Sequence, residues 1–113
     1  MPYHIYVIEL DRKVYSESRK FREANPQFNP MLDCLYVGMT SKSPKVRFEQ
    51  HKSGYTSKRG HNLSSRIVFE YGKMLRPSLY RQIPVLKTRT EALDMEKKLA
   101  LELRRQRYAV WFN

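Results

Sequence analysis

Cysteine, acidic residues and long apolar runs are all scarce in this chain of 113 residues. Cys34 is the single cysteine, so an internal disulfide is impossible and nothing indicates an oxidising compartment. The N-terminal apolar run 5–8 is too short for a signal peptide or a membrane span. We therefore expect a soluble, cytoplasmic protein without a membrane partner.

The balance of charge is strongly positive. Lys and Arg number 22 against 11 Asp and Glu, a formal net charge of +11, which favours polyanions such as nucleic acid as partners. A basic ribosomal or membrane-surface protein would have a similar composition. The apolar share of 41% is typical of globular proteins, and a chain of this length is expected to form one domain over residues 1–113.

Three segments have the β-branched and aromatic composition of strands: Tyr3–Leu10, Leu35–Val37 and Arg66–Tyr71. Gly38 ends the second strand and Gly72 the third. The polar stretch 11–33 has few apolar anchors and two prolines. We interpret it as an insertion, part helix over about 13–24 and part loop, that joins the first two strands as a pair.

Two helices follow from capping signals and spacing. Ser43 and Pro44 are typical of a helix start, and that helix is predicted to end at Gly54 with Arg47, Phe48 and His51 on one stripe. A second helix is predicted over about 91–107, capped by Thr88 or Thr90, with Glu96 interrupting its apolar stripe. The tail after it is apolar and is expected to pack back as a short extended segment.

Ionisable groups therefore occupy positions that periodicity assigns to the interior. A carboxylate, an arginine, a histidine and phenols near a small sheet could supply a metal ligand, a phosphate clamp and groups that move a proton, a set that suits phosphodiester cleavage. The alternative is structural: Glu96 would form a buried ion pair with Arg47, and Tyr6 and Tyr36 would be core rings. His51 could likewise be a surface imidazole near a helix end.

These residues resemble the motifs of the GIY-YIG nuclease superfamily. Residues 4–6 followed by 7–8 resemble the first motif, and residues 36–38 resemble the second. Arg47 and His51 resemble the motif on the first helix, and Glu96 resembles the glutamate on the later helix. The resemblance implies an α+β fold with a small three-stranded, mainly antiparallel sheet flanked by helices.

The chain departs from the family pattern at two positions. His4 stands where the first motif has glycine. Ala109 stands where the family commonly has an asparagine near the end of the domain, and Asn113 is a candidate substitute. The second departure leaves open whether the chain is an active nuclease.

The resemblance also implies a mechanism. Glu96 would bind a divalent metal, Mg²⁺ or Mn²⁺, and Arg47 would neutralise the phosphate. Tyr6 is the first candidate to activate water, with Tyr36 and His51 tuning it, and the choice between the tyrosines stays open. Because Cys34, His4, His51 and His61 have no metal-like spacing, we predict no zinc site.

Basic residues near the proposed pocket are candidates for phosphate contacts, although such runs are most often solvated faces: Lys42, Lys45, Lys58 and Arg59. The first hypothesis is a metal-dependent endonuclease acting on DNA with low sequence specificity. The second is a nucleic-acid-binding module of the same fold, for DNA or RNA, with weak or no catalysis. The third is a basic RNA- or ribosome-associated protein.

Overall fold

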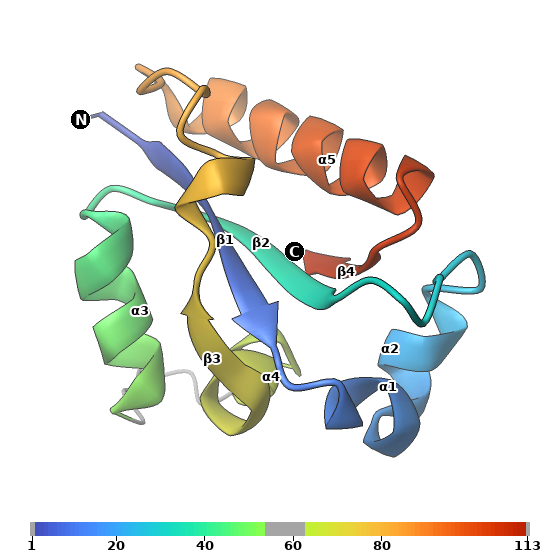
Figure 1. Cartoon of the computed structure of the whole chain (residues 1–113). Coiled ribbons are helices and arrows are strands. Elements are labelled where there is room, and N and C mark those ends of the chain that lie inside the picture. Colours follow the sequence, from blue (N-terminus) through green and yellow to red (C-terminus); the bar gives the residue numbers. More distant parts are fainter. Residues whose placement is uncertain (1, 54–62, 113) are drawn as a thin grey trace.

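A mixed sheet of four strands forms the centre of the computed structural model, which describes residues 2–53 and 63–112 (Figure 1). The strands are β1 (His4–Leu10), β2 (Cys34–Thr40), β3 (Gly72–Leu75) and β4 (Ala109–Phe112), in the order β3-β1-β2-β4. The helices are α1 (Lys13–Glu17), α2 (Arg19–Glu23), α3 (Pro44–Lys52), α4 (Leu63–Tyr71) and α5 (Arg89–Arg105), with one 3₁₀ turn, η1 (Pro77–Leu79).

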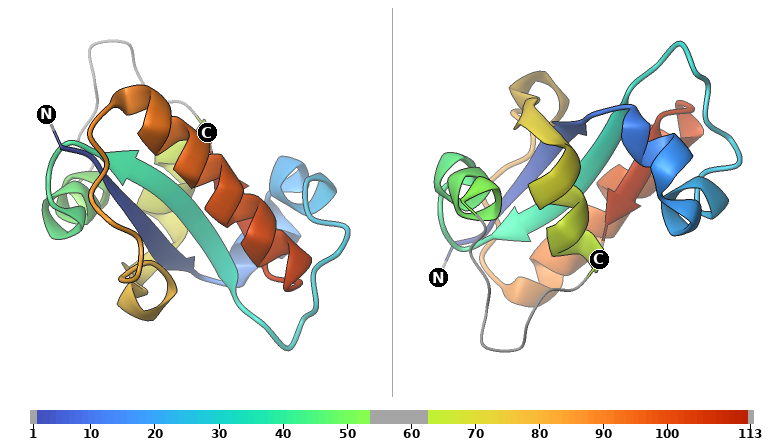
Figure 2. Two further views of the ribbon diagram at one scale, coloured as in Figure 1. Left: turned by 90° about the horizontal axis from the view of Figure 1, so that it is seen from above. Right: turned by 90° about the horizontal axis from the view of Figure 1, so that it is seen from below.

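The two faces of the sheet carry separate apolar clusters. In Figure 2, α5 crosses one face and α4 crosses the other, with α3 beside it. Tyr6, Ile8 and Tyr36 pack on the α4 side, whereas Val7 and Val37 pack on the α5 side. This alternation along β1 and β2 is the period of two expected of strands covered on both faces.

The α+β class is confirmed, but the sheet differs from the predicted three antiparallel strands. β1 pairs antiparallel with β2 and with β3, whereas β4 adds a fourth strand parallel to β2. β4 is the tail that was predicted to be extended. Ala109 and Val110 are fully buried there, and the strand pairing satisfies backbone groups that burial would otherwise leave without a partner.

The predicted third strand over Arg66–Tyr71 is wrong, because these residues belong to α4. Ile67 and Val68 are both buried while Phe69 is exposed, which is a helical and not an alternating pattern. The third strand, β3, begins directly afterwards at Gly72. A Cβ atom on Gly72 would lie 2.5 Å from the carbonyl oxygen of Val68, so the sharp change from helix to strand requires glycine.

The segment 11–33 forms two short helices and a loop. The predicted helix is interrupted at Ser18, whose side-chain oxygen accepts from the Phe21 N–H at the start of α2. Asn25 is fully buried, and its Oδ1 accepts from the Val110 N–H at 2.7 Å while its amide donates to the Phe21 carbonyl at 2.8 Å. The segment therefore holds β4 in place.

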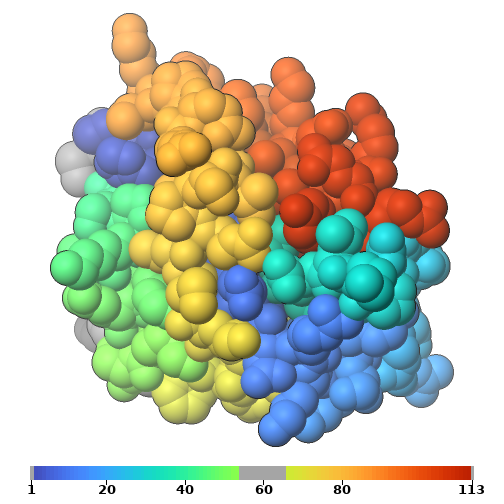
Figure 3. Space-filling model, viewed as in Figure 1, coloured from blue at the N-terminus to red at the C-terminus, as the bar shows by residue number. Residues whose placement is uncertain are grey.

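The segment from β3 through η1 toward α5 lies across β1 in the space-filling view (Figure 3). β1 pairs with a strand on each side, and its backbone at Val7 also accepts from the Arg76 N–H at 2.8 Å. β1 is thus paired with β2 along its whole length and with β3 over its last three residues, and both of its faces are covered. A side chain on this strand is held in a fixed position, which suits a catalytic role for Tyr6.

Candidate active site

Two tyrosines lie beside each other on the α4 side of the sheet. Tyr6 and Tyr36 are 1% and 2% exposed, and their ring centroids are 6.2 Å apart. Tyr6 pairs with Gly38, and a Cβ atom on Gly38 would lie 2.6 Å from both Cζ and the hydroxyl oxygen of Tyr6. The glycine of the second motif therefore leaves the space that the Tyr6 phenol fills.

Helix α3 brings His51 to these phenols. The helix starts as predicted, with the Ser43 side chain accepting from the Val46 N–H at 3.2 Å and Pro44 at the first position. His51 is 6% exposed, and its Nε2 lies 3.4 Å from the Tyr6 hydroxyl oxygen. Its ring meets the Tyr36 ring edge-on at 6.2 Å between centroids. His51 is not a surface imidazole.

Arg47 lies one helical turn before His51 on the same stripe and is half-buried. Its guanidinium Nη1 is 3.5 Å from the Gln50 Oε1. The nearby guanidinium of Arg47 acts to lower the pKa of Tyr6, against the larger effect of burial. Arg47 is therefore close to the phenol as well as to solvent.

Glu96 approaches from the other layer. α5 starts as predicted, with the Thr88 Oγ1 accepting from the Glu91 N–H at 3.1 Å, and Glu96 is only 1% exposed. Its negative charge raises the pKa of Tyr6 and of Tyr36, so the carboxylate acts electrostatically on both phenols. In the described residues β4 ends at Phe112, which pairs with Val37, and β4 does not extend alongside Gly38. Side chains from the two faces of the sheet can therefore meet beside Gly38.

Burial and neighbouring charges set the protonation of the cluster. Burial raises the pKa of Tyr6 to about 12, against the opposing effect of Arg47, and raises the pKa of Tyr36 well above its usual value. Burial, and then the positive charge of Arg47, lowers the pKa of His51 to about 4. At neutral pH the imidazole is thus uncharged and able to accept a proton.

The neighbours of the Tyr6 hydroxyl suggest a route for a proton. The Tyr36 ring lies beside that of Tyr6, and each phenol acts on the pKa of the other. The Tyr6 hydroxyl can donate to the neutral Nε2 of His51. With a pKa of about 4, His51 is too weak a base to keep the proton of Tyr6, so the contact is suited to passing that proton on toward solvent. Such a short chain of groups is capable of general base chemistry.

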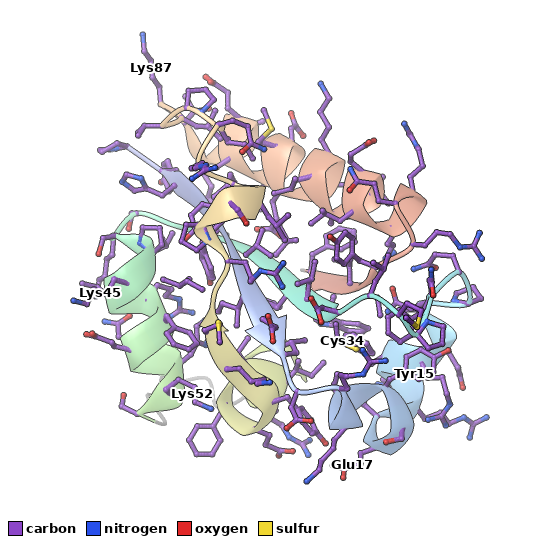
Figure 4. The ribbon with its side chains drawn as sticks, in the orientation of Figure 1. Tyr15, Glu17, Cys34, Lys45, Lys52 and Lys87 are labelled. Carbon is purple, nitrogen blue, oxygen red and sulfur yellow. The ribbon has the colours of Figure 1, made fainter. Side chains whose placement is uncertain are left out.

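The predicted basic contacts are only partly near this cluster. Lys42 lines a hollow next to Arg47. Lys45 is exposed on α3 and points away from the sheet in Figure 4. Lys58 and Arg59 lie outside the described residues. Arg89 also lines the hollow, although the sequence analysis did not select it; its position two helical turns before Glu96 was the available signal.

The two departures from the family pattern have different settings. His4 begins β1 opposite Thr40, so a non-glycine residue is accommodated in the strand. Ala109 is fully buried, pairs with Cys34 and packs in the cluster on the α4 side. Its methyl group offers no polar atom to the site, and Asn113 lies outside the described residues.

The donor set at this site fits a hard divalent cation with few protein ligands. Glu96 supplies one buried carboxylate near the phenols. Among residues 2–53 and 63–112, no three His, Cys, Asp or Glu side chains are grouped so as to hold a metal ion. A single carboxylate suits Mg²⁺, which keeps several waters, better than Zn²⁺, which prefers closed sites of nitrogen and sulfur.

In the part that the structure describes, no helix has the length and apolar character needed to cross a bilayer. No curated protein and no solved structure matches the chain.

One protein-family model does match, over residues 28–109, and its description is GIY-YIG catalytic domain. The match contains the Tyr36-Val37-Gly38 triplet, α3 and Glu96, whereas Tyr6 precedes it. The position of Tyr6 therefore comes from the pairing of β1 with β2 and not from the family match. The match spans well over half of the chain, and the protein belongs to the GIY-YIG family.

Proposed function

We propose that this protein is a metal-dependent endonuclease that hydrolyses phosphodiester bonds in DNA with low sequence specificity, in a cytoplasmic setting. The observation that carries the proposal is the buried contact between Tyr6 and His51, with Arg47 and Glu96 acting on the same phenol. A family whose domains are nucleases and a net charge of +11 support the same conclusion.

Tyr6 is the general base in this proposal. Its hydroxyl releases its proton to solvent by way of the neutral Nε2 of His51, and in this proposal the Tyr36 hydroxyl stabilises the phenolate by donating to it. The phenolate then takes a proton from the attacking water. A phenol of high pKa needs positive charge beside it to act in this way, and Arg47 supplies part of that charge.

Arg47 and Glu96 act on the phosphate side of the reaction. The half-buried guanidinium of Arg47 donates to the phosphate oxygens, where negative charge grows in the transition state. Glu96 would hold Mg²⁺ or Mn²⁺, and a bound ion of this kind stabilises the leaving oxygen. The low sequence specificity follows from a site built of phosphate-directed groups without a recognisable base-reading motif.

A second candidate function is a nucleic-acid-binding module of the same fold without catalysis. The observation that favours it is Ala109, which brings no polar group to the position where the family commonly has an asparagine. Such a protein would bind DNA or RNA in a salt-sensitive way and cut neither. A basic RNA-associated protein with structural tyrosines would in addition prefer RNA in competition.

The test is nicking of supercoiled plasmid DNA with Mg²⁺ or Mn²⁺, with and without EDTA. Glu96→Gln should abolish cleavage while binding of the plasmid persists. Asp94→Asn is the matched control, because Asp94 is exposed on the same helix and the change removes the same charge. Cleavage by Glu96→Gln at the wild-type rate would exclude the metal role. A wild-type protein that binds DNA but cuts no plasmid or branched DNA would favour the second function.

A further inference from the structure

A hollow of about 370 Å³ lies beside the proposed active site, at the end of the sheet where four elements meet. Its lining comes from the residue before β1, the end of β2 with the turn that follows it, α3 and the first residue of α5. Figure 2 shows these elements converging at that end of the sheet. The hollow is open to solvent beside Arg47, so a ligand that reaches Arg47 also faces this space.

The charge of the lining is of one sign. Lys42, Arg47 and Arg89 contribute cationic groups, and none of the described residues that line the hollow is Asp or Glu. Elsewhere several arginines are paired: Arg76 contacts Glu9 and Asp33 at 2.8 and 2.9 Å. Cations gathered around one hollow without acidic partners repel one another, and a bound anion would reverse that cost.

Arg47 links the hollow to the proposed chemistry, because it lines the hollow and lies one helical turn before His51, which contacts the Tyr6 hydroxyl. Arg89 provides a second link. It precedes Glu96 by seven residues on α5, which places the two on the same stripe about 10 Å apart along the helix axis. An anion held by Arg89 would therefore lie close to, but apart from, the scissile phosphate.

Because DNA carries a phosphate on each strand about every 3.4 Å along its axis, 10 Å corresponds to roughly three nucleotides. We propose that this hollow binds one backbone phosphate of the DNA, close to the scissile phosphate on the same strand, and that Arg89 holds it. This proposal rests on the proposed function. Lys42 completes the positive lining. Contacts of this kind set the register of the strand in the site and read no base.

The experiment measures binding of a fluorescent 20-base-pair DNA duplex by anisotropy in EDTA, over 50–200 mM KCl. Arg89→Ala should reduce the slope of log Kd against log[salt] by about 0.9, because one phosphate contact is lost. The ratio of the variant's Kd to the wild-type Kd should then be about 3.5-fold larger at 50 mM than at 200 mM salt. Arg89→Lys keeps the charge and should keep the slope.

Lys98→Ala is the matched control. Lys98 is exposed on the same helix, and nine residues place it about 180° around the axis from Arg89. It lines a different, mainly apolar hollow together with Leu99. Its removal should leave the slope unchanged. An unchanged slope for Arg89→Ala, or an equal reduction for Lys98→Ala, would overturn the proposal.

Plasmid cleavage by the same preparations separates the two proposals. If wild-type protein cuts DNA while Arg89→Ala keeps the wild-type slope, the phosphate-binding hollow is refuted and the nuclease function stands. If no preparation cuts DNA while the slope falls only for Arg89→Ala, the hollow binds a backbone phosphate in a protein without catalysis. The binding measurement contains no divalent metal, so its result does not depend on turnover.

Discussion

The hydroxyl oxygen of Tyr6 lies 3.4 Å from Nε2 of His51, and both side chains are almost completely buried. The distance is at the long end for a hydrogen bond, as is common for catalytic contacts before substrate binds. Because burial keeps the imidazole neutral, this nitrogen is an acceptor when the ring carries its proton on Nδ1. In that tautomer the contact gives the Tyr6 hydroxyl a proton acceptor.

Replacing Tyr6 by Phe should therefore remove most of the cleavage activity while the ring continues to fill the space over Gly38. We expect the single-turnover rate to fall by about 10²- to 10⁴-fold, the usual contribution of a positioned general base. Tyr36→Phe is the comparison, and about a tenfold loss is expected because it only stabilises the phenolate. A larger loss for Tyr36→Phe than for Tyr6→Phe would reverse the assignment of the base.

The pH dependence of cleavage should follow the ionisation of Tyr6. Its pKa is raised to about 12, so the phenolate fraction grows about tenfold for each pH unit across the working range. The logarithm of kcat/KM should accordingly rise with a slope near one between pH 6 and 9. The profile is measured on one oligonucleotide substrate at constant ionic strength. A bell-shaped profile with a maximum near pH 7 would instead indicate another base.

His51 should make folding sensitive to mild acid. The pKa of this imidazole is about 4 in the folded protein against 6.5 when exposed, so protonation below pH 6.5 favours the unfolded chain. The stabilisation is complete above pH 6.5 and is lost as the pH falls toward 4. Between pH 7 and 5 this group alone should lower the free energy of unfolding by about 2 kcal/mol.

Urea unfolding of wild type and His51→Gln at both pH values isolates that contribution, because glutamine does not titrate and all other groups are shared. The wild type should lose about 2 kcal/mol more than the variant on going from pH 7 to 5. Equal losses in the two proteins would mean that His51 is accessible to water in the folded state.

Gly38→Ala should damage the site through the Tyr6 ring. The new Cβ atom would lie 2.6 Å from Cζ of Tyr6, so the ring or the strand must shift, at a cost of about 1–3 kcal/mol. In a Tyr6→Leu background the nearest obstruction is absent, while Cε2 of Tyr36, 2.8 Å from the new Cβ atom, remains; the same substitution should therefore cost about 1 kcal/mol less. Thermal unfolding of the four proteins gives this coupling energy.

Gly72→Ala is the control for that cycle. Its Cβ atom would meet the backbone carbonyl of Val68 and not the Tyr6 ring, and Gly72 pairs with Leu10, four residues along β1 from Tyr6, so its cost should be the same in both backgrounds. A cost of Gly38→Ala that is equally independent of residue 6 would show that the glycine is needed for the strand or for the Tyr36 ring, and not for the Tyr6 phenol.

Local signals explain what could be predicted from the sequence. Ser43 and Thr88 cap their helices with a bond to an N–H three residues later, a contact that needs no knowledge of the rest of the fold. The buried stripe of α3 and the burial of Glu96 likewise follow from helical spacing. The family resemblance, which rested on the order of short motifs, is confirmed by the match over 28–109.

Non-local relationships account for what was missed. The segment Arg66–Tyr71 has strand-like residue types, and its helical state follows from packing Ile67 and Val68 against one face of the sheet. Arg89 becomes relevant only because the start of α5 meets the end of β2. Asn25 lies in a polar segment without periodicity, and its partner Val110 is 85 residues away.

Asn25 connects the segment 11–33 to β4, because its side chain bonds the Val110 backbone. Substitution by Ala would leave the buried Val110 N–H and the Phe21 carbonyl without these partners, which should cost about 2–4 kcal/mol of stability. Asn25→Asp keeps the acceptor for Val110 and should cost less than Ala if that bond dominates.

Gln27→Ala is the comparison within the same network. The Gln27 amide donates to the Tyr108 carbonyl and to Asn25 Oδ1, so this change removes one bond to Asn25 and keeps the bonds of Asn25 to Val110 and Phe21. The free energy of unfolding of Asn25→Ala, measured in urea, should be well below that of Gln27→Ala. Plasmid cleavage by folded Asn25→Ala at low temperature should stay near the wild-type rate, since Val110 lies on the α5 side of the sheet, away from Tyr6 and His51. A folded variant without activity would mean instead that the position of β4 controls the active site.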